Sequence, residues 1–257
     1  MTIAARLKIY EPDGAMLGVL RHPMSWSASL PWNDIPAMRL QAPVADPDTG
    51  LLDEPVEVAL EVNHGEGWVE PANARYRRLD VVADAAQRQA DVISYAMPGY
   101  GDLLDGVTVV PAKFGNPAMF DEDGKRKFLS ASVGEILITV LDEARAVVND
   151  LVPGVEFAFT KAKDARGANW NRRVTIYYEP GMSLLTILSN LADQGQCDWW
   201  FQGRALHVVN ADMSVTHTNI RLQGSPSQHP IRSSLSGLLH TAYLVGEEET
   251  LRADNPA

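Results

Sequence analysis

The sequence predicts an α+β fold that is mainly β: an antiparallel β-barrel or sandwich domain with an inserted α+β domain. Strands that alternate apolar and polar residues dominate positions 1–98. Two helices with N-terminal capping signals follow, and each repeats its apolar residues at helical spacing. We therefore expect a β-domain over 1–98, an inserted α+β domain over 99–221, and a return segment over 222–257 that rejoins the first domain.

The strands of the first domain follow from period-two patterns. Residues 6–10 alternate, 25–30 place Trp26, Ala28 and Leu30 on one face, and 56–62 place four apolar residues opposite Glu57, Ala59 and Glu61. Such strands are typical of a sheet with one buried and one solvated face. Further strands are predicted at 77–84 and 89–95.

The second domain begins where Pro98-Gly99-Tyr100-Gly101 interrupts the strand pattern. We predict a helical turn at 102–105, a short strand at 107–110 and a surface loop at 113–127. Ser132 and Glu135 form a capping box that starts an amphipathic helix, which runs to about Asn149. Strands are predicted at 155–160 and 173–178.

The clearest supersecondary unit of the chain spans residues 181–209. Ser183 caps a second helix, and Gly195 can adopt the left-handed conformation that ends one. Segments 197–201 and 205–209 flank Gln-Gly-Arg, which predicts a hairpin. A last strand is predicted at 241–246, and because no partner strand lies near it in the sequence, we expect it to pair with the first domain.

Composition excludes several classes of function. The 22 basic and 33 acidic side chains give a formal charge of −11, which does not favour a protein that grips the phosphate backbone of nucleic acid. The single cysteine, Cys197, allows no intramolecular disulfide and is expected to be a buried apolar residue. No signal peptide or membrane segment is predicted, so we expect synthesis in the cytoplasm.

The motifs of common enzymes and metal sites are incomplete. Asp48-Thr49-Gly50 matches an aspartic protease triplet, but Pro47 and the acidic neighbours indicate a turn. The acidic runs near 46–57 and 121–124 lack the spacing of a calcium loop. The six histidines are not spaced for zinc. We therefore predict no enzymatic activity, no catalytic residue, no metal and no cofactor.

Two groups of residues are candidates for contact with a partner or another subunit. The first is a basic loop with one tryptophan, whose alternative interpretation is a solvated loop. The second is an aromatic pair whose side chains share one face of a strand, and whose alternative is a buried core. These candidates are Lys161, Lys163, Arg166, Trp170, Arg172, Arg173, Trp199 and Phe201.

Three segments resemble the tail hub proteins of long-tailed bacteriophages, in particular the minor tail proteins of actinobacterial siphophages. They are the N-terminal β-domain, the segment Gly99-Tyr100-Gly101-Asp102-Leu103-Leu104-Asp105-Gly106-Val107 through Pro111, and the helix with an aromatic hairpin at 183–209. Residues 242–246 are similar to the strand by which such chains return to the tube. Relatives commonly complete a second β-domain after that strand, whereas this sequence stops at residue 257.

The resemblance implies a structural subunit of the tail tip or baseplate hub, with 1–98 as a tube domain. It implies a ring, usually a homotrimer, that continues the tail tube and conducts DNA without binding it specifically. The implied partners are distal tail, tube, tape measure and tail fibre proteins, and the implied location is the virion tail tip after assembly in the host cytoplasm.

Two other functions remain open at the level of sequence. A carbohydrate-binding module for the host cell surface would use Trp199 and Phe201, or Trp68 and Trp170, as stacking faces. A hydrolase would need two carboxylates placed on the wall of an apolar cleft, and the sequence contains many acids without singling out a pair.

Overall fold

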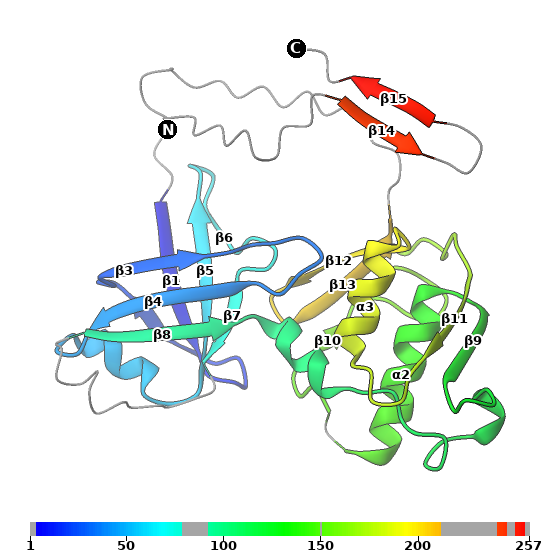
Figure 1. The fold of residues 1–257 in the computed structure, drawn as a ribbon. Helices are drawn as coiled ribbons and strands as arrows, with labels where there is room; N and C mark the ends of the chain where they lie inside the picture. Colours follow the sequence, from blue (N-terminus) through cyan, green and yellow to red (C-terminus); the bar gives the residue numbers. More distant parts are fainter. Residues whose placement is uncertain (1–3, 79–91, 150, 212–240, 246–249, 255–257) are drawn as a thin grey trace. The chain divides into compact units, whose positions relative to one another are not determined.

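The computed structural model describes residues 4–78, 92–149, 151–211, 241–245 and 250–254 (Figure 1). These residues form a mixed fold that is mainly β, with antiparallel sheets and few helices. Residues 1–214 make one compact unit and residues 215–257 a second. Within the first unit, buried apolar side chains gather in two clusters, one formed by residues 7–97 and the other by residues 100–208.

Two sheets enclose the first cluster. The first sheet has the order β2-β1-β5-β6, with β7 also paired to β5, and the second has the order β3-β4-β8. A bridge between Tyr76 and Gly99 joins the two sheets, but no closed barrel forms among the described residues. The strands are β1 (Ala4–Tyr10), β2 (Met16–Leu20), β3 (Ser25–Ala28), β4 (Ala37–Pro43), β5 (Val56–Asn63), β6 (Trp68–Val69), β7 (Arg75–Arg78) and β8 (Val92–Pro98).

Strands β2, β4 and β6 were not predicted from the sequence. Strand β4 is central to its sheet, since it pairs with β3 on one side and β8 on the other. Its buried residues Met38, Leu40 and Ala42 alternate with exposed ones, so the period-two pattern was present. The strand predicted at 77–84 overlaps β7 at residues 77 and 78. Residues 79–91 fall outside the described residues.

The expectation of a solvated outer face on β5 is wrong. Glu57, Ala59 and Glu61 are all buried, although they point away from the first cluster. Charged side chains cover them: Arg6 and Lys8 pair with Glu61, and three donors surround Glu57. The sheet is therefore buried on both faces at this strand.

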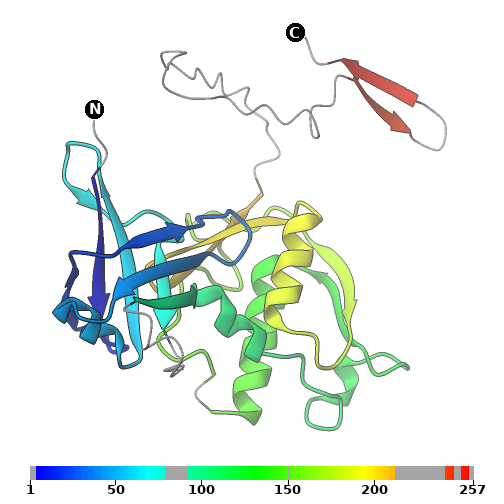
Figure 2. The same cartoon turned by 60° about the vertical axis from the view of Figure 1, so that its left-hand side comes forward.

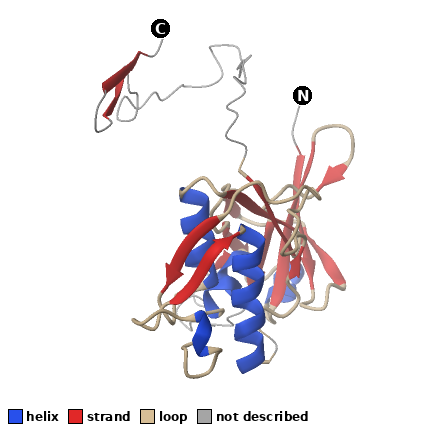
Figure 3. Ribbon diagram, turned by 90° about the vertical axis from the view of Figure 1, so that its right-hand side faces the viewer, coloured by secondary structure: helices blue, strands red, loops and turns tan. Residues whose placement is uncertain are grey.

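The second cluster is built around two helices that lie side by side against a two-stranded sheet, β9–β11 (Figure 3). In α2 the predicted capping box is present, because Ser132 Oγ accepts from the Glu135 amide and Glu135 accepts from the Ser132 amide. The elements are η2 (Tyr100–Gly106), η3 (Pro117–Met119), β9 (Arg126–Ala131), α2 (Val133–Val147), β10 (Glu156–Phe157), β11 (Val174–Tyr178) and α3 (Leu184–Asp193).

Helix α3 leads into the predicted hairpin, formed by β12 (Cys197–Gln202) and β13 (Ala205–Asn210). The helix begins after Ser183, and Gly195 has a positive φ of 64°, as expected for a helix that ends in a left-handed glycine. Figure 2 shows the hairpin running between the N-terminal sheets and the helices. It therefore borders both hydrophobic clusters.

Two predicted strands of this region are shorter than expected. Segment 107–110 makes only a bridge from Thr108 to Ser183, and segment 155–160 is a strand only at Glu156–Phe157. The loop expected at 113–127 contains η3 and the start of β9.

The last predicted strand has a local partner after all. Strand β14 (Thr241–Val245) pairs antiparallel with β15 (Thr250–Asp254), only a few residues further along the chain. The expectation that it lacked a nearby partner is therefore wrong. Pairing with the first domain stays a prediction, and residues 212–240 lie outside the described residues.

Candidate functional site

The basic loop at 161–173 is shaped by a buried carboxylate. Asp164 is 5% exposed, and its Oδ1 accepts hydrogen bonds of 2.9 Å from the amides of Arg166 and Ala168. Its Oδ2 accepts from Asn210 at the end of β13. A carboxylate that binds backbone amides on both sides fixes a loop tightly. The predicted cations therefore sit on a rigid loop.

Three of the predicted residues come together in one cleft. Lys161, Trp170 and Arg173 line a cleft of about 310 Å³ together with Ser132 and Glu135 at the N-terminus of α2. Trp170 forms one wall, and its indole N–H donates to the Thr160 carbonyl over 3.0 Å. The indole is also packed edge-on against Phe159.

The cleft is lined by charges of both signs. Arg173 Nη2 lies 3.2 Å from Glu135 Oε1, and Lys161 Nζ lies 2.8 Å from Asp142 Oδ2. The Ser132 amide, followed by Arg173, lowers the pKa of Glu135 below its ordinary value. Because each cation has a carboxylate beside it, the cleft offers hydrogen-bond donors and acceptors rather than a strong positive field.

The other cations of the loop do not join this cleft. Arg172 Nη1 donates over 2.8 Å to the Gly195 carbonyl, where α3 ends. A cation there stabilises the negative end of the helix dipole, so Arg172 has a structural role. Lys163 and Arg166 are exposed, and neither makes an ion pair with another described residue.

Trp199 and Phe201 do share one face of β12, but that face is buried. They are 0% and 2% exposed, and their rings meet edge-on at a centroid distance of 6.5 Å. The expectation that they form a subunit contact or a sugar-stacking face is corrected here, because no part of either ring is open to a partner. They belong to the second cluster.

The free edge of β12 is occupied by two asparagines from the N-terminal part of the chain. The backbone amide of Asn33 donates to the Trp199 carbonyl over 3.1 Å. Its side-chain Oδ1 accepts from the Trp199 backbone amide over 2.6 Å. Asn73 binds Phe201 in the same way, with both distances 2.7 Å. Their φ angles are 59° and 58°, a conformation that asparagine tolerates better than most residues. We call these two residues the asparagine clips.

A buried ionic cluster joins the same two parts of the chain. Glu57, 3% exposed, accepts hydrogen bonds from Arg75 of β7 and from Tyr100 of η2. Arg204, in the hairpin turn, adds two further contacts of 2.6 and 3.1 Å. A carboxylate with several charged donors is well compensated for its burial. Glu57 thus links β5 to the hairpin.

Sequence reasoning missed an aromatic stack on the other face of the hairpin. Trp200 and His207 are direct cross-strand partners whose rings stack at 5.2 Å and 12°. Trp32, from the loop between β3 and β4, stacks on Trp200 at 4.6 Å and 16°. Trp32 remains 52% exposed. The alternation along β12 places Trp200 opposite Trp199 and Phe201, but nothing in the sequence pointed to Trp32.

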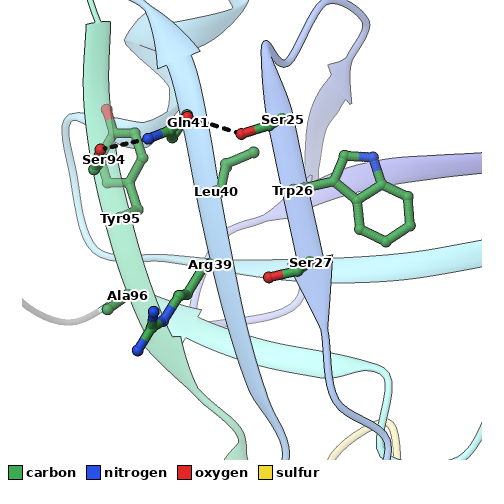
Figure 4. Close-up of a pocket in the computed structure, with 9 residues that line it drawn as sticks. All are labelled: Ser25, Trp26, Ser27, Arg39, Leu40, Gln41, Ser94, Tyr95 and Ala96. Carbon is green, nitrogen blue, oxygen red and sulfur yellow. Dashed lines mark hydrogen bonds between the residues drawn. The ribbon is translucent and has the colours of Figure 1, made fainter. Parts of the chain in front are cut away.

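A polar surface covers the outer face of the β3–β4–β8 sheet, beside a shallow cleft of about 630 Å³ (Figure 4). A row of hydrogen bonds crosses the three strands, from Ser25 to Gln41 at 2.8 Å and from Gln41 to Ser94 at 3.4 Å. Arg39 lies one step along the sheet, opposite Ser27 and Ala96. Around this row the outward side chains are Ser25, Ser27, Arg39, Gln41, Ser94 and Ala96, and the face is solvated.

The acidic segments form turns, as the sequence indicated. Asp48-Thr49-Gly50 lies in the 3-10 helix η1 (Pro47–Leu52), which Asp46 caps. In the part of the chain that the structure describes, no three His, Cys, Asp or Glu side chains are grouped closely enough to hold a metal ion. None of the helices among the described residues has the length and apolar character needed to cross a membrane.

Cys197 is buried, as the sequence indicated, at 0% exposure. Burial, with a smaller effect from Asp198, raises the pKa of its thiol to about 12.

No family model and no curated protein matches this chain.

Proposed function

We propose that this chain is a structural subunit of a phage tail tip, in which identical copies form a ring that continues the tail tube. The observation that supports the proposal is that two open sheet edges of the N-terminal part, at β2 and β3, expose large apolar side chains. Strands β2 and β3 each pair on one side only among the described strands, with β1 and β4 respectively.

Both edges expose large apolar side chains. Met16 and Leu17 on β2 are 52% and 39% exposed, and Met24 and Trp26 at β3 are 60% and 39% exposed. Monomeric proteins usually protect an edge strand with charges, prolines or bulges, because an apolar edge invites pairing with another chain. Edges of this kind are useful in a subunit whose neighbours cover them.

In this proposal the open sheets of several copies complete a closed tube that no single copy closes. Closed homo-oligomers with cyclic symmetry bury such edges in every copy at once. The formal charge of −11 supports a tube that conducts DNA, because an acidic lumen repels phosphate. The expected neighbours are other tail proteins, and the expected state is a homotrimer.

The test is the oligomeric state of the full chain and its position in the particle. Mass photometry and negative-stain images should show symmetric rings whose contacts bury more than about 2,000 Å² each. Antibody labelling of purified virions should mark the tail tip. A stable monomer at every concentration, also with tail partners present, would overturn the proposal.

Edge variants connect the assembly to these strands. Met16→Lys and Met24→Lys each place a charge on an open edge, and we expect them to weaken the ring while the chain stays folded. Leu129→Lys is the matched control, because Leu129 is 61% exposed on β9, which belongs to a different sheet from β2 and β3. Equal effects of all three variants would argue against edge pairing.

A further inference from the structure

We propose that the exposed ring of Trp32 is a stacking site for the pyranose ring of a neutral saccharide. The site is the end of the aromatic stack formed by Trp32, Trp200 and His207, whose rings are nearly parallel. One face of Trp32 rests on Trp200, and its exposure of 52% leaves the other side of the ring open to a ligand. A large aromatic ring offers a ligand wide contact at little cost in conformational entropy.

The loop that carries Trp32 is held firmly in place. Its neighbour Asn33 is one of the asparagine clips and binds both backbone groups of Trp199. Its other neighbour, Pro31, accepts a hydrogen bond from the second clip, Asn73. A ring fixed before binding loses little freedom when a ligand stacks on it, which favours affinity.

Polar groups that suit sugar hydroxyls flank the stack. Asp198 lies on the same face of β12 as Trp200, since the two residues are two positions apart on one strand. Its Oδ1 accepts from Asn33 Nδ2 over 2.8 Å, so that its second oxygen can accept from a ligand. Asp34, next to Trp32, is exposed and uses Oδ1 to accept from the Ile35 amide.

The shape and charge of the site favour a saccharide over other ligands that stack on tryptophan. An organic cation is usually held by several rings that surround it, whereas these three rings are stacked and offer a single open face. A nucleotide would bring phosphate close to Asp34 and Asp198 on an acidic protein. A neutral sugar ring has apolar C–H groups for Trp32 and hydroxyls for the two carboxylates.

The tryptophans named as stacking faces from the sequence are less available. Trp199 is buried, Trp170 is packed against Phe159, and Trp68 lies under the guanidinium of Arg6 at 4.2 Å. Trp32, at 52% exposure, is therefore more available to a saccharide than these three. This inference does not depend on the ring proposed above, because a monomer would offer the same surface.

The first experiment follows the six tryptophan indole signals of the full chain by ¹⁵N TROSY NMR. The probes are maltohexaose, cellohexaose, xylohexaose and chitohexaose at millimolar concentration, with tetramethylammonium and adenosine monophosphate as alternatives. We expect at least one oligosaccharide to shift the indole signals of Trp32 and Trp200 and to leave that of Trp199 unchanged. No shift with any oligosaccharide, or shifts only with one of the alternatives, would overturn the proposal.

The second experiment measures affinity for the oligosaccharide that gives the largest shift. Trp32→Ala should bind it roughly tenfold more weakly, since stacked aromatic contacts contribute on that order. Trp32→Tyr should recover part of the affinity, and Trp68→Ala is the matched control that should bind as the unaltered chain does. If Trp32→Ala binds with unchanged affinity, the site is elsewhere and the proposal fails. If that variant does not fold, the comparison between Trp32→Tyr and the unaltered chain decides.

Discussion

Asn73 and Phe201 are joined by a pair of 2.7 Å hydrogen bonds, one from each backbone amide. Asn73 thus makes the two hydrogen bonds that a neighbouring strand would make, one through its backbone amide and one through its side-chain oxygen. Its side-chain nitrogen also donates to the Pro31 carbonyl. The residue is 1% exposed. Contacts of this kind hold the two hydrophobic clusters together across positions far apart in the sequence.

Replacing Asn73 with alanine should lower the free energy of unfolding by about 2–4 kcal/mol. The change leaves the buried Phe201 amide and the Pro31 carbonyl without the Asn73 side chain, and it puts alanine, which tolerates the left-handed conformation less well than asparagine, at a positive φ. Urea unfolding of the full chain measures the loss. Asn73→Gly removes the same hydrogen bonds without the strain, so it should lose about 1 kcal/mol less. Equal losses would mean that the positive φ of 58° is not costly.

Glu57→Gln should cost about 3–5 kcal/mol, because it removes the charge that compensates Arg204 in a buried site, whereas Arg75 keeps its ion pair with Glu70. The side chain keeps its shape, so packing is not the cause. Chemical denaturation gives the value. Asp142→Asn is the control, because both side chains of the Asp142–Lys161 ion pair are about half exposed. The denaturation midpoint of this variant should equal that of the unaltered chain. A stable Glu57→Gln protein would show that the cluster contributes little.

Gly134→Ala should destabilise the chain by about 1–3 kcal/mol, although alanine favours a helix more than glycine does. A Cβ at this position would overlap the Thr160 carbonyl and the indole nitrogen of Trp170. The thermal midpoint and the near-ultraviolet signal of Trp170 report the change. Gly106→Ala places its Cβ in open space and should leave both unchanged.

The capping box should make stability depend on pH in the acid range. The folded pKa of Glu135 is below its ordinary value of 4.5, chiefly because of the Ser132 amide, with Arg173 as a further cause. Its stabilising effect is therefore complete above that value and is lost as the pH falls through the folded pKa. The stability difference between the unaltered chain and Glu135→Gln, measured in urea, should shrink on acidification. A difference that stays constant with pH would contradict this.

Cys197 should be inert in the folded protein. Its thiol is buried and its pKa is raised to about 12, so almost no reactive thiolate exists near neutral pH. A thiol reagent should label the chain only as fast as it unfolds, and should label it at once in denaturant. Rapid labelling without denaturant would show that the core around α3 and β12 opens easily.

Local signals predicted the local elements well. The caps Ser132 and Ser183 fixed the starts of α2 and α3, and the turn around Gly203, whose φ is 58°, fixed the hairpin. These elements depend on residues within a few positions of one another. Strand β4 was missed although its alternation is clear, because it follows a proline and ends in one, which resembles a loop.

Contacts between distant residues could not be predicted in the same way. The pattern of β5 indicated a solvated face, but Glu57 is buried because Arg75, Tyr100 and Arg204 approach it, the last from 147 positions away. The same holds for the aromatic stack, where Trp32 reaches Trp200 from another part of the chain. The candidate cleft was predicted in part. Its cations were named from the sequence, but their ion pairs with Glu135 and Asp142 were not.

The asparagine clips affect where a strand from another molecule can pair with this protein. On β12 the amides and carbonyls of Trp199 and Phe201 already have partners, so an incoming peptide would find no unsatisfied backbone group at those positions. Addition of a strand at these two positions is thereby blocked by two neutral asparagines, and not by charged or proline residues. Strands β2 and β3, by contrast, each pair on one side only among the described strands, so their other side can still accept an added strand.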